Sequence, residues 1–206
     1  MKRILTVAVT VLAVCVSSSS FAQYGGRQQV GPIDPEGHAS APSSTSDAPP
    51  DPEAQAEDLR LHGQCDKAIP IFRRLAARGG FELAQFNLGL CLIDVGKKES
   101  DAQRSASLKA EGAGDVLAAA NSGLANAQLK LVTLYLDGVG VASDPLEAGK
   151  WALIYHSNGS RFVISLPDIS PELQARLDGV LTATSWAEAQ ARADAWSPVA
   201  KDWDAR

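Results

Sequence analysis

The chain has 206 residues, of which 45% are hydrophobic, 21% charged and 6% aromatic, and its formal net charge is −5. This composition is typical of a soluble globular protein and excludes collagen, a coiled-coil rod, a multi-span membrane protein and a wholly disordered chain. The acidic balance also disfavours nucleic acid as a partner, because binding to phosphates needs clustered Lys and Arg side chains.

The first residues predict a cleaved secretory signal peptide over 1–22. Lys2 and Arg3 precede an apolar run over 4–16, and small residues allow cleavage after Ala22. Cleavage removes two basic residues, which leaves 17 basic and 24 acidic residues and a net charge of −7. We therefore expect a periplasmic or secreted protein.

This segment has two other interpretations. A membrane anchor is excluded because spanning a bilayer takes about 20 apolar residues, so no membrane span is expected after cleavage. Lipidation at Cys15 has a weak motif, since Val14 is bulkier than the small residue that such a site requires. Export by a cleaved signal peptide is favoured.

Residues 23–53 have the composition of a disordered linker. Six of the eleven prolines lie here, together with four glycines and a Ser/Thr cluster at 43–46. Such a segment buries too little apolar surface to offset the entropy lost on ordering. Asp51 and Pro52 predict the start of the first helix, because Asp is a good N-cap and Pro fits the first helical position.

Helix-length segments rich in Ala and Leu follow, and no period-two strand pattern is found. Residues 76–94 align without gaps to residues 119–137, an offset of 43 residues. The shared residues recur at helical spacing, as Ala84, Leu88 and Leu92 do, so they predict the same buried stripe on two helices. An all-α chain of repeats is therefore expected.

These residues resemble the tetratricopeptide superfamily and, within it, the Sel-one-like repeat. Residues 63–79 are similar to the second helix of one unit, and residues 126–159 are similar to a nearly complete unit with its Gly-Val-Gly-Val turn. The resemblance covers about residues 54–160. It implies a short right-handed α-solenoid of helix-turn-helix units.

Two details of the repeats can be predicted. The interval after the first stripe is seven residues longer than the interval after the second, and the polar stretch 97–111 is expected to lengthen a helix or a loop. Asp144, Pro145 and Glu147 predict an N-cap, a first-turn proline and a capping-box glutamate for the helix that follows.

Residues 161–206 are expected to form a C-terminal helical cap. Ser170 with Pro171 predicts one helix, and the capping box Ser185–Glu188 predicts the start of another. A buried stripe on this second helix is favoured over an exposed, ligand-binding one. The stripe consists of Trp186, Ala189, Ala193 and Trp196.

Cys65 and Cys91 remain after cleavage, and the repeat register places them on neighbouring helices. An even number of cysteines in an oxidising compartment predicts a structural disulfide between them. Two separate buried thiols are the alternative.

No catalytic motif, metal-binding pair or nucleotide-binding loop is recognisable, so no catalytic residue, cofactor or metal site is expected. The Gly138–Gly140 segment follows a predicted helix rather than a strand, which predicts a turn. An alternative function is a cell-envelope hydrolase that acts on peptidoglycan-type material through Asp and Glu side chains. Only the exported location favours it.

The resemblance implies a concave groove lined by the first helix of each unit. In it, Asn87 would bond a peptide backbone, Lys130 would meet a carboxylate and Phe86 would be an apolar anchor, although ordinary exposed positions are the alternative. The full set of groove residues is Phe86, Asn87, Leu90, Leu129, Lys130 and Thr133. We expect an exported, non-enzymatic protein–protein interaction module, an adaptor or scaffold of the bacterial cell envelope, that binds a protein or peptide there.

Overall fold

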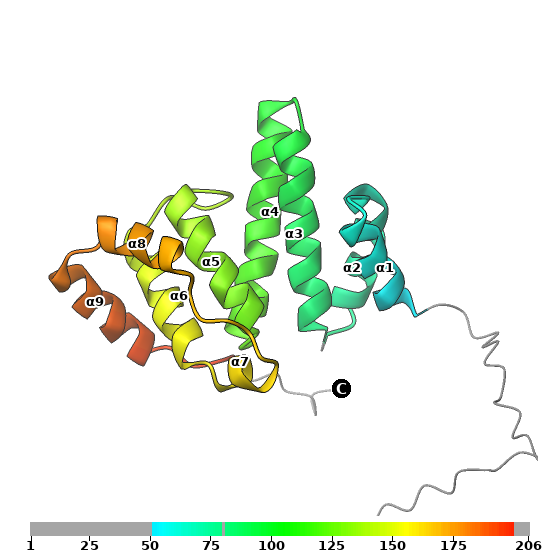
Figure 1. The fold of residues 1–206 in the computed structure, drawn as a ribbon. Coiled ribbons are helices and arrows are strands. Elements are labelled where there is room, and N and C mark those ends of the chain that lie inside the picture. The colour runs from blue at the N-terminus through cyan, green and yellow to red at the C-terminus, as the bar shows by residue number, and fades with distance from the viewer. Residues whose placement is uncertain (1–50, 80, 200–206) are drawn as a thin grey trace, which may run out of the picture. The chain divides into compact units, whose positions relative to one another are not determined.

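A computed structural model describes residues 51–79 and 81–199, so the predicted signal peptide, Cys15 and most of the predicted linker lie outside the described residues. The described residues form nine helices and no strand, which confirms the predicted all-α class (Figure 1). None of these helices is long and apolar enough to cross a membrane. The helices are α1 (Pro52–Leu61), α2 (Cys65–Ala76), α3 (Glu82–Lys98), α4 (Ala102–Asn121), α5 (Ala125–Asp137), α6 (Pro145–Ser157), α7 (Gly159–Val163), α8 (Pro171–Val180) and α9 (Ala183–Asp194).

The first six helices form three consecutive pairs, α1 with α2, α3 with α4 and α5 with α6, and each pair packs against the next. The stripe predicted from the self-alignment is buried on α3, where Ala84, Leu88 and Leu92 are at most 4% exposed. Its counterparts Ala127 and Leu131 are fully buried on α5. Because each stripe occupies the same place in its pair, the pairs stack into a short α-solenoid, as predicted.

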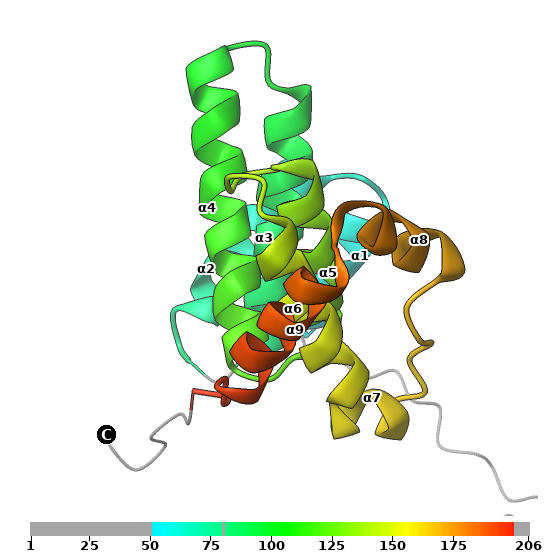
Figure 2. The ribbon, with the colours of Figure 1, turned by 90° about the vertical axis from the view of Figure 1, so that its left-hand side faces the viewer.

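The seven extra residues lengthen helices rather than a loop. Helices α3 and α4 have 17 and 20 residues, against 13 in each of α5 and α6, and they extend beyond their neighbours (Figures 1 and 2). The long helices α3 and α4 can lie side by side because their backbones are in close contact. A Cβ atom on Gly89 of α3 would lie 2.5 Å from the Gly112 carbonyl oxygen of α4. Near the tip, the Ser105 hydroxyl donates to the Gly96 carbonyl oxygen at 2.6 Å.

A disulfide joins Cys65, the first residue of α2, to Cys91 on α3. Both residues belong to the apolar cluster that the first two pairs share, together with the fully buried Phe72. The predicted disulfide is therefore confirmed, and the alternative of two separate thiols is not.

Side-chain caps begin several helices where the sequence places them. Asp51 caps α1 and Ser170 caps α8, each followed by a proline at the first position. Asp144 caps α6 by accepting from two backbone amides. The predicted capping-box role of Glu147 is wrong, because the Asp144 amide donates to the Tyr135 carbonyl oxygen instead.

Helix α9 begins earlier than predicted. Thr182, rather than Ser185, is its N-cap, and the Thr182 side chain accepts from the Ser185 amide. The apolar stripe of α9 packs against the core, as favoured: Ala189 is fully buried, and the rings of Trp196 and Trp151 meet edge to face with centroids 5.8 Å apart. Helix α9 therefore covers α6, the last helix of the pairs.

Candidate binding surface

The first helices of the three pairs share one side of the molecule, which we call the A face. The Asn87 amide on α3 donates to the Glu57 carboxylate on α1 at 2.8 Å, which shows that these two helices meet on this side. The alignment offset places Lys130 on α5 at the position of Asn87 on α3. The A face comprises Glu57, Arg60, Asn87, Leu90, Asp94, Lys97, Lys130, Thr133 and Asp137.

Two of the predicted groove residues serve packing instead. Phe86 is 9% exposed and belongs to the main apolar cluster. Asn87 is 4% exposed, and its amide is engaged by Glu57, which also accepts from Arg60. Neither side chain is available to a partner at the surface, because Phe86 packs into the apolar cluster shared by the α3–α4 and α5–α6 pairs and Asn87 lies against α1. The other four predicted residues, Leu90, Leu129, Lys130 and Thr133, are half-buried, and their role in binding stays a prediction.

The acidic side chains of the A face are paired with cations, two within a helix and one between helices. Glu57 pairs with Arg60 on α1, and Asp94 pairs with Lys97 on α3. Asp137, at the end of α5, pairs with Arg176 of α8. Each carboxylate of the A face is thus matched by a neighbouring cation, and most of these groups are about a quarter to a half exposed.

Lys130 differs from these paired cations. Its ammonium makes no salt bridge and no hydrogen bond with any residue of 51–79 or 81–199. Burial lowers the pKa of this ammonium below its usual range, and the positive charge of Lys97 lowers it further, while Asp94 and Asp137 oppose the shift. The A face therefore presents one partly desolvated positive charge without a partner close enough to neutralise it.

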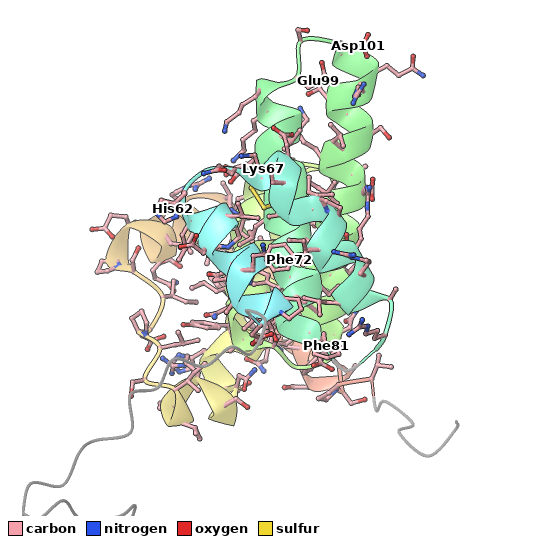
Figure 3. All side chains as sticks on the ribbon, turned by 90° about the vertical axis from the view of Figure 1, so that its right-hand side faces the viewer. His62, Lys67, Phe72, Phe81, Glu99 and Asp101 are labelled. Atoms are coloured by element: carbon pink, nitrogen blue, oxygen red, sulfur yellow. A yellow bond between two sulfur atoms is a disulfide. The ribbon has the colours of Figure 1, made fainter. Side chains whose placement is uncertain are left out.

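Helices α7 and α8 lie on the same side of the array as α1 (Figures 2 and 3). Helix α8 borders α5 through the ion pair between Arg176 and Asp137. Helix α7 lies beside the amino-terminal ends of α3 and α5, where Ser160 and Ile164 line a hollow of about 220 Å³ together with Glu82 and Leu124. The A face is thus bounded by α1 at one end, by α8 at the other and by α7 along one edge.

An exposed apolar patch on and after α7 was missed in the sequence. Phe162, Val163 and Ile164 are 66%, 83% and 55% exposed, and we call these three residues the α7 patch. Leu83 is 46% exposed, and it lies one helical turn before Asn87, on the same stripe of α3. A run of three large apolar residues outside any periodic pattern is the signal that could have identified this patch.

A second hollow, of about 370 Å³, lies at the turn between α4 and α5, where Trp196 and Pro198 form one wall. Its buried polar groups satisfy one another. The Asn158 amide donates to the Gln128 side-chain oxygen at 2.8 Å and to the Gly123 carbonyl oxygen at 2.9 Å. These bonds hold α7 against the last two pairs, so we assign this network a structural role.

The titratable groups of the described residues form no cluster that could hold a metal ion. The Nδ1 atom of exposed His156 lies 3.2 Å from the Asp168 carboxylate. The Ile169 backbone amide donates to the same carboxylate, and these contacts lower the pKa of Asp168. Both side chains are exposed, His156 near the end of α6 and Asp168 between α7 and α8. The arrangement is that of a surface ion pair.

Comparison with known proteins gives a similarity to solved structures. No protein-family profile matches the chain, and no curated protein matches it. Among solved structures, the chain is similar to a protective antigen present in uropathogenic Escherichia coli strains, which displays an SLR fold. The identity is 27%, the match covers 70% of this chain with a TM-score of 0.48, and the chain spans 29% of the length of that protein.

Three stacked helix pairs, two of which repeat the same buried stripe, define the class of this protein as an α-solenoid. Within that class the chain resembles Sel-one-like repeat proteins, as predicted from the Gly-Val-Gly-Val turn. That turn follows α5, and both of its glycines have left-handed backbone, φ of 65° at Gly138 and 73° at Gly140.

Proposed function

We propose that this chain is an exported, non-enzymatic interaction module that binds a protein or peptide on its A face. The observation that supports this most directly is the unpaired, half-buried ammonium of Lys130 among side chains that are otherwise paired. A desolvated charge without a partner costs folding free energy, and it is a common feature of binding surfaces. Stacked helix pairs provide the extended surface that such modules use.

Export is part of the same proposal. A disulfide persists in oxidising compartments and is rare in the cytosol, so the bond between Cys65 and Cys91 is compatible with the predicted signal peptide. Mass spectrometry of the protein isolated from cells tests this directly. We expect a mature chain that begins at Gln23, and an intact chain in the cytosolic fraction would contradict export.

Site-specific photo-crosslinking in the native cells tests the binding surface. A photoreactive amino acid placed at Leu90 or Thr133 reports on the A face, and one placed at Ala106 on α4 is the matched control, because this exposed residue lies on the second helix of its pair. We expect an adduct of discrete mass from the first two positions only. Adducts from Ala106 alone would move the site to the other face, and no adduct from any position would contradict the proposed function.

A further inference from the structure

The disulfide between Cys65 and Cys91 has two sulfur atoms in different surroundings. Cys65 is 5% exposed at the start of α2, whereas Cys91 is fully buried on α3. A hollow of about 210 Å³ is lined by Cys65 and not by Cys91. We propose that Cys65 is a thiol–disulfide exchange site of the folded protein. A low-molecular-weight thiol attacks the Cys65 sulfur there, and Cys91 is first the leaving thiol and then the resolving thiol.

Access determines which sulfur is attacked, because the incoming sulfur must contact one of the two disulfide sulfurs. The hollow lies at the end of α2 that carries Lys67, on the side of the α3–α4 tip that carries Glu99 (Figure 3). Cys91 lies instead in the apolar cluster of the first two pairs, to which Phe72 also belongs. A thiol therefore reaches Cys65 from solvent, whereas it reaches Cys91 only if the first pair separates from α3.

The hollow fits a small polar molecule. Pockets for drug-sized ligands have about 300–1,000 Å³, so this hollow of about 210 Å³ holds a smaller one. Its lining includes the charged residues Asp66, Lys98 and Glu99 and the apolar Val95. Charges of both signs beside the sulfur suit a small polar thiol, and they offer an apolar protein surface little to contact. The attacking molecule is therefore a small thiol rather than a redox protein.

The position of Cys65 also favours its reaction when the disulfide is open. Cys65 is the first residue of α2, and the side chain of the N-cap residue Gln64 makes no capping bond. Backbone amides at the start of a helix stabilise a negative charge, which favours the thiolate, the form that reacts. The apolar surroundings of buried Cys91 disfavour a thiolate. Cys65 is therefore the first of the two thiols to react with an oxidised thiol compound.

The exchange conserves atoms and electrons. The incoming thiol gives its proton to solvent and its sulfur bonds to Cys65, while the bond between Cys65 and Cys91 breaks and Cys91 leaves with the electron pair and then takes up a proton. The products are a mixed disulfide at Cys65 and a free thiol at Cys91. The two Cα atoms lie 5.0 Å apart in the closed form, so Cys91 stays within reach to attack Cys65 and expel the thiol. Because a thiolate at buried Cys91 is costly, the closed disulfide is the resting state.

Partial exchange on the full chain tests which sulfur is attacked. The folded, oxidised protein is treated briefly with 2-mercaptoethanol, and free thiols are then blocked with N-ethylmaleimide. Trypsin places the two cysteines on separate peptides, 61–67 and 79–97, which mass spectrometry reads independently of Cys15. We expect mercaptoethanol on Cys65 with N-ethylmaleimide on Cys91 about tenfold more often than the reverse pattern. Equal amounts of the two patterns, or an excess of the reverse one, would overturn the inference.

Two single variants test the same sites without the disulfide. In Cys91→Ser the thiol of Cys65 is free, and in Cys65→Ser the thiol of Cys91 is free. With oxidised glutathione, Cys65 should form its adduct about 100-fold faster than Cys91, provided that circular dichroism shows both variants to be folded. If the variants do not fold, the mercaptoethanol pattern of the unaltered chain decides the question. Equal rates in folded variants would contradict the proposed site.

A substitution that fills the hollow tests the route of access. Ser100 is exposed and lines the hollow, so Ser100→Phe should slow the reaction of mercaptoethanol with the folded protein about tenfold. Ser107→Phe is the matched control, because Ser107 is exposed on α4 and does not line the hollow, and it should leave the rate unchanged. The same rate in both variants would show that the thiol enters elsewhere.

Urea distinguishes exchange in the folded protein from exchange after unfolding. Attack through the hollow should proceed at the same rate with and without about 1 M urea, because the folded state already exposes the route. A rate that rises in proportion to the unfolded fraction would overturn the inference. No residue of the hollow belongs to the A face, so each of these outcomes leaves the proposed function standing.

Discussion

Gly140 lies in the turn between α5 and α6 with φ of 73°, a left-handed conformation that L side chains rarely adopt. A Cβ at this position would also lie 2.1 Å from the Lys109 carbonyl oxygen on α4. We expect Gly140→Ala to lower the free energy of unfolding by roughly 2–4 kcal/mol, because backbone strain and overlap add. Urea unfolding followed by circular dichroism measures the change.

The control for this prediction is Gly114, which lies in the middle of α4. A Cβ there meets nothing within 4 Å, so Gly114→Ala should raise the free energy of unfolding by up to about 1 kcal/mol through helix propensity. Equal effects of the two substitutions would contradict the assigned contact between the turn and α4.

Asp115 on α4 is a half-buried carboxyl whose ionisation makes the stability of the protein depend on pH. Burial raises its pKa above the ordinary value of 3.8, and a hydrogen bond with Gln85 opposes this shift. Because the pKa of Asp115 is raised in the folded state, its contribution to the free energy of unfolding is fully present below pH 3.8. That contribution is lost as the pH rises through the folded pKa. We expect Asp115→Asn to stabilise the protein at pH 7 by less than about 1 kcal/mol, since solvent screens a group that is half exposed.

The same substitution should give no gain at pH 3, where the carboxyl is protonated in both the folded and the unfolded states. Urea midpoints at the two pH values provide the measurement. A gain at pH 3 as large as that at pH 7 would show that burial of the charge is not the cause.

At the scale of elements, the disulfide ties the start of α2 to α3 across 26 residues of sequence. Closing a loop of this length stabilises a fold by about 3.5 kcal/mol in the chain-entropy model. We expect dithiothreitol to lower the free energy of unfolding by about this amount. The double variant Cys65→Ala and Cys91→Ala should match the reduced protein and should not respond to the reductant, and a response would assign the effect to another group.

The helix starts show where local sequence patterns succeed and where they fail. The N-caps Asp51 and Asp144 are predictable because their bonds involve only the next two or three residues. The sequence pattern predicts a capping box at Glu147, but its carboxylate accepts from Lys150 at 2.8 Å and from Arg192 of α9 at 3.1 Å. A partner 45 residues away is invisible to a pattern that covers four residues.

For the whole molecule, α9 is the element that covers the last helix pair. Ala189 is fully buried against α6, where a Cβ on Gly149 would lie 3.2 Å from it, and Ala187 is exposed on the same helix. We expect Ala189→Asp to cost about 3 kcal/mol or more, because it buries an unpaired charge and displaces Trp196 from Trp151.

Ala187→Asp is the matched control and should change stability by at most about 0.5 kcal/mol, since it puts the same charge on the exposed side. Urea unfolding followed by tryptophan fluorescence distinguishes the two variants. If both had the same effect, α9 would not act as the cap of the array.

The candidate site was predictable only in part. Helical spacing and the repeat offset placed Lys130 and Thr133 on the first helix of a pair, and that placement holds. The same reasoning treats Phe86 and Asn87 as equivalent surface positions, but Phe86 packs between the α3–α4 and α5–α6 pairs and Asn87 bonds to α1. An offset between repeats says which residues are equivalent, whereas burial depends on which neighbouring pair packs there.

The sequence by itself determined the all-α class, the helix pairs, the buried stripes and the cysteine pairing, because these follow from periodicity, end signals and cysteine count. Only the tertiary structure decided that Lys130 is unpaired, that Phe162, Val163 and Ile164 are exposed, and that Glu147 bonds to α9. Exposure and pairing are properties of contacts between residues that are distant in sequence. They are set when the helix pairs stack, so local patterns do not contain them.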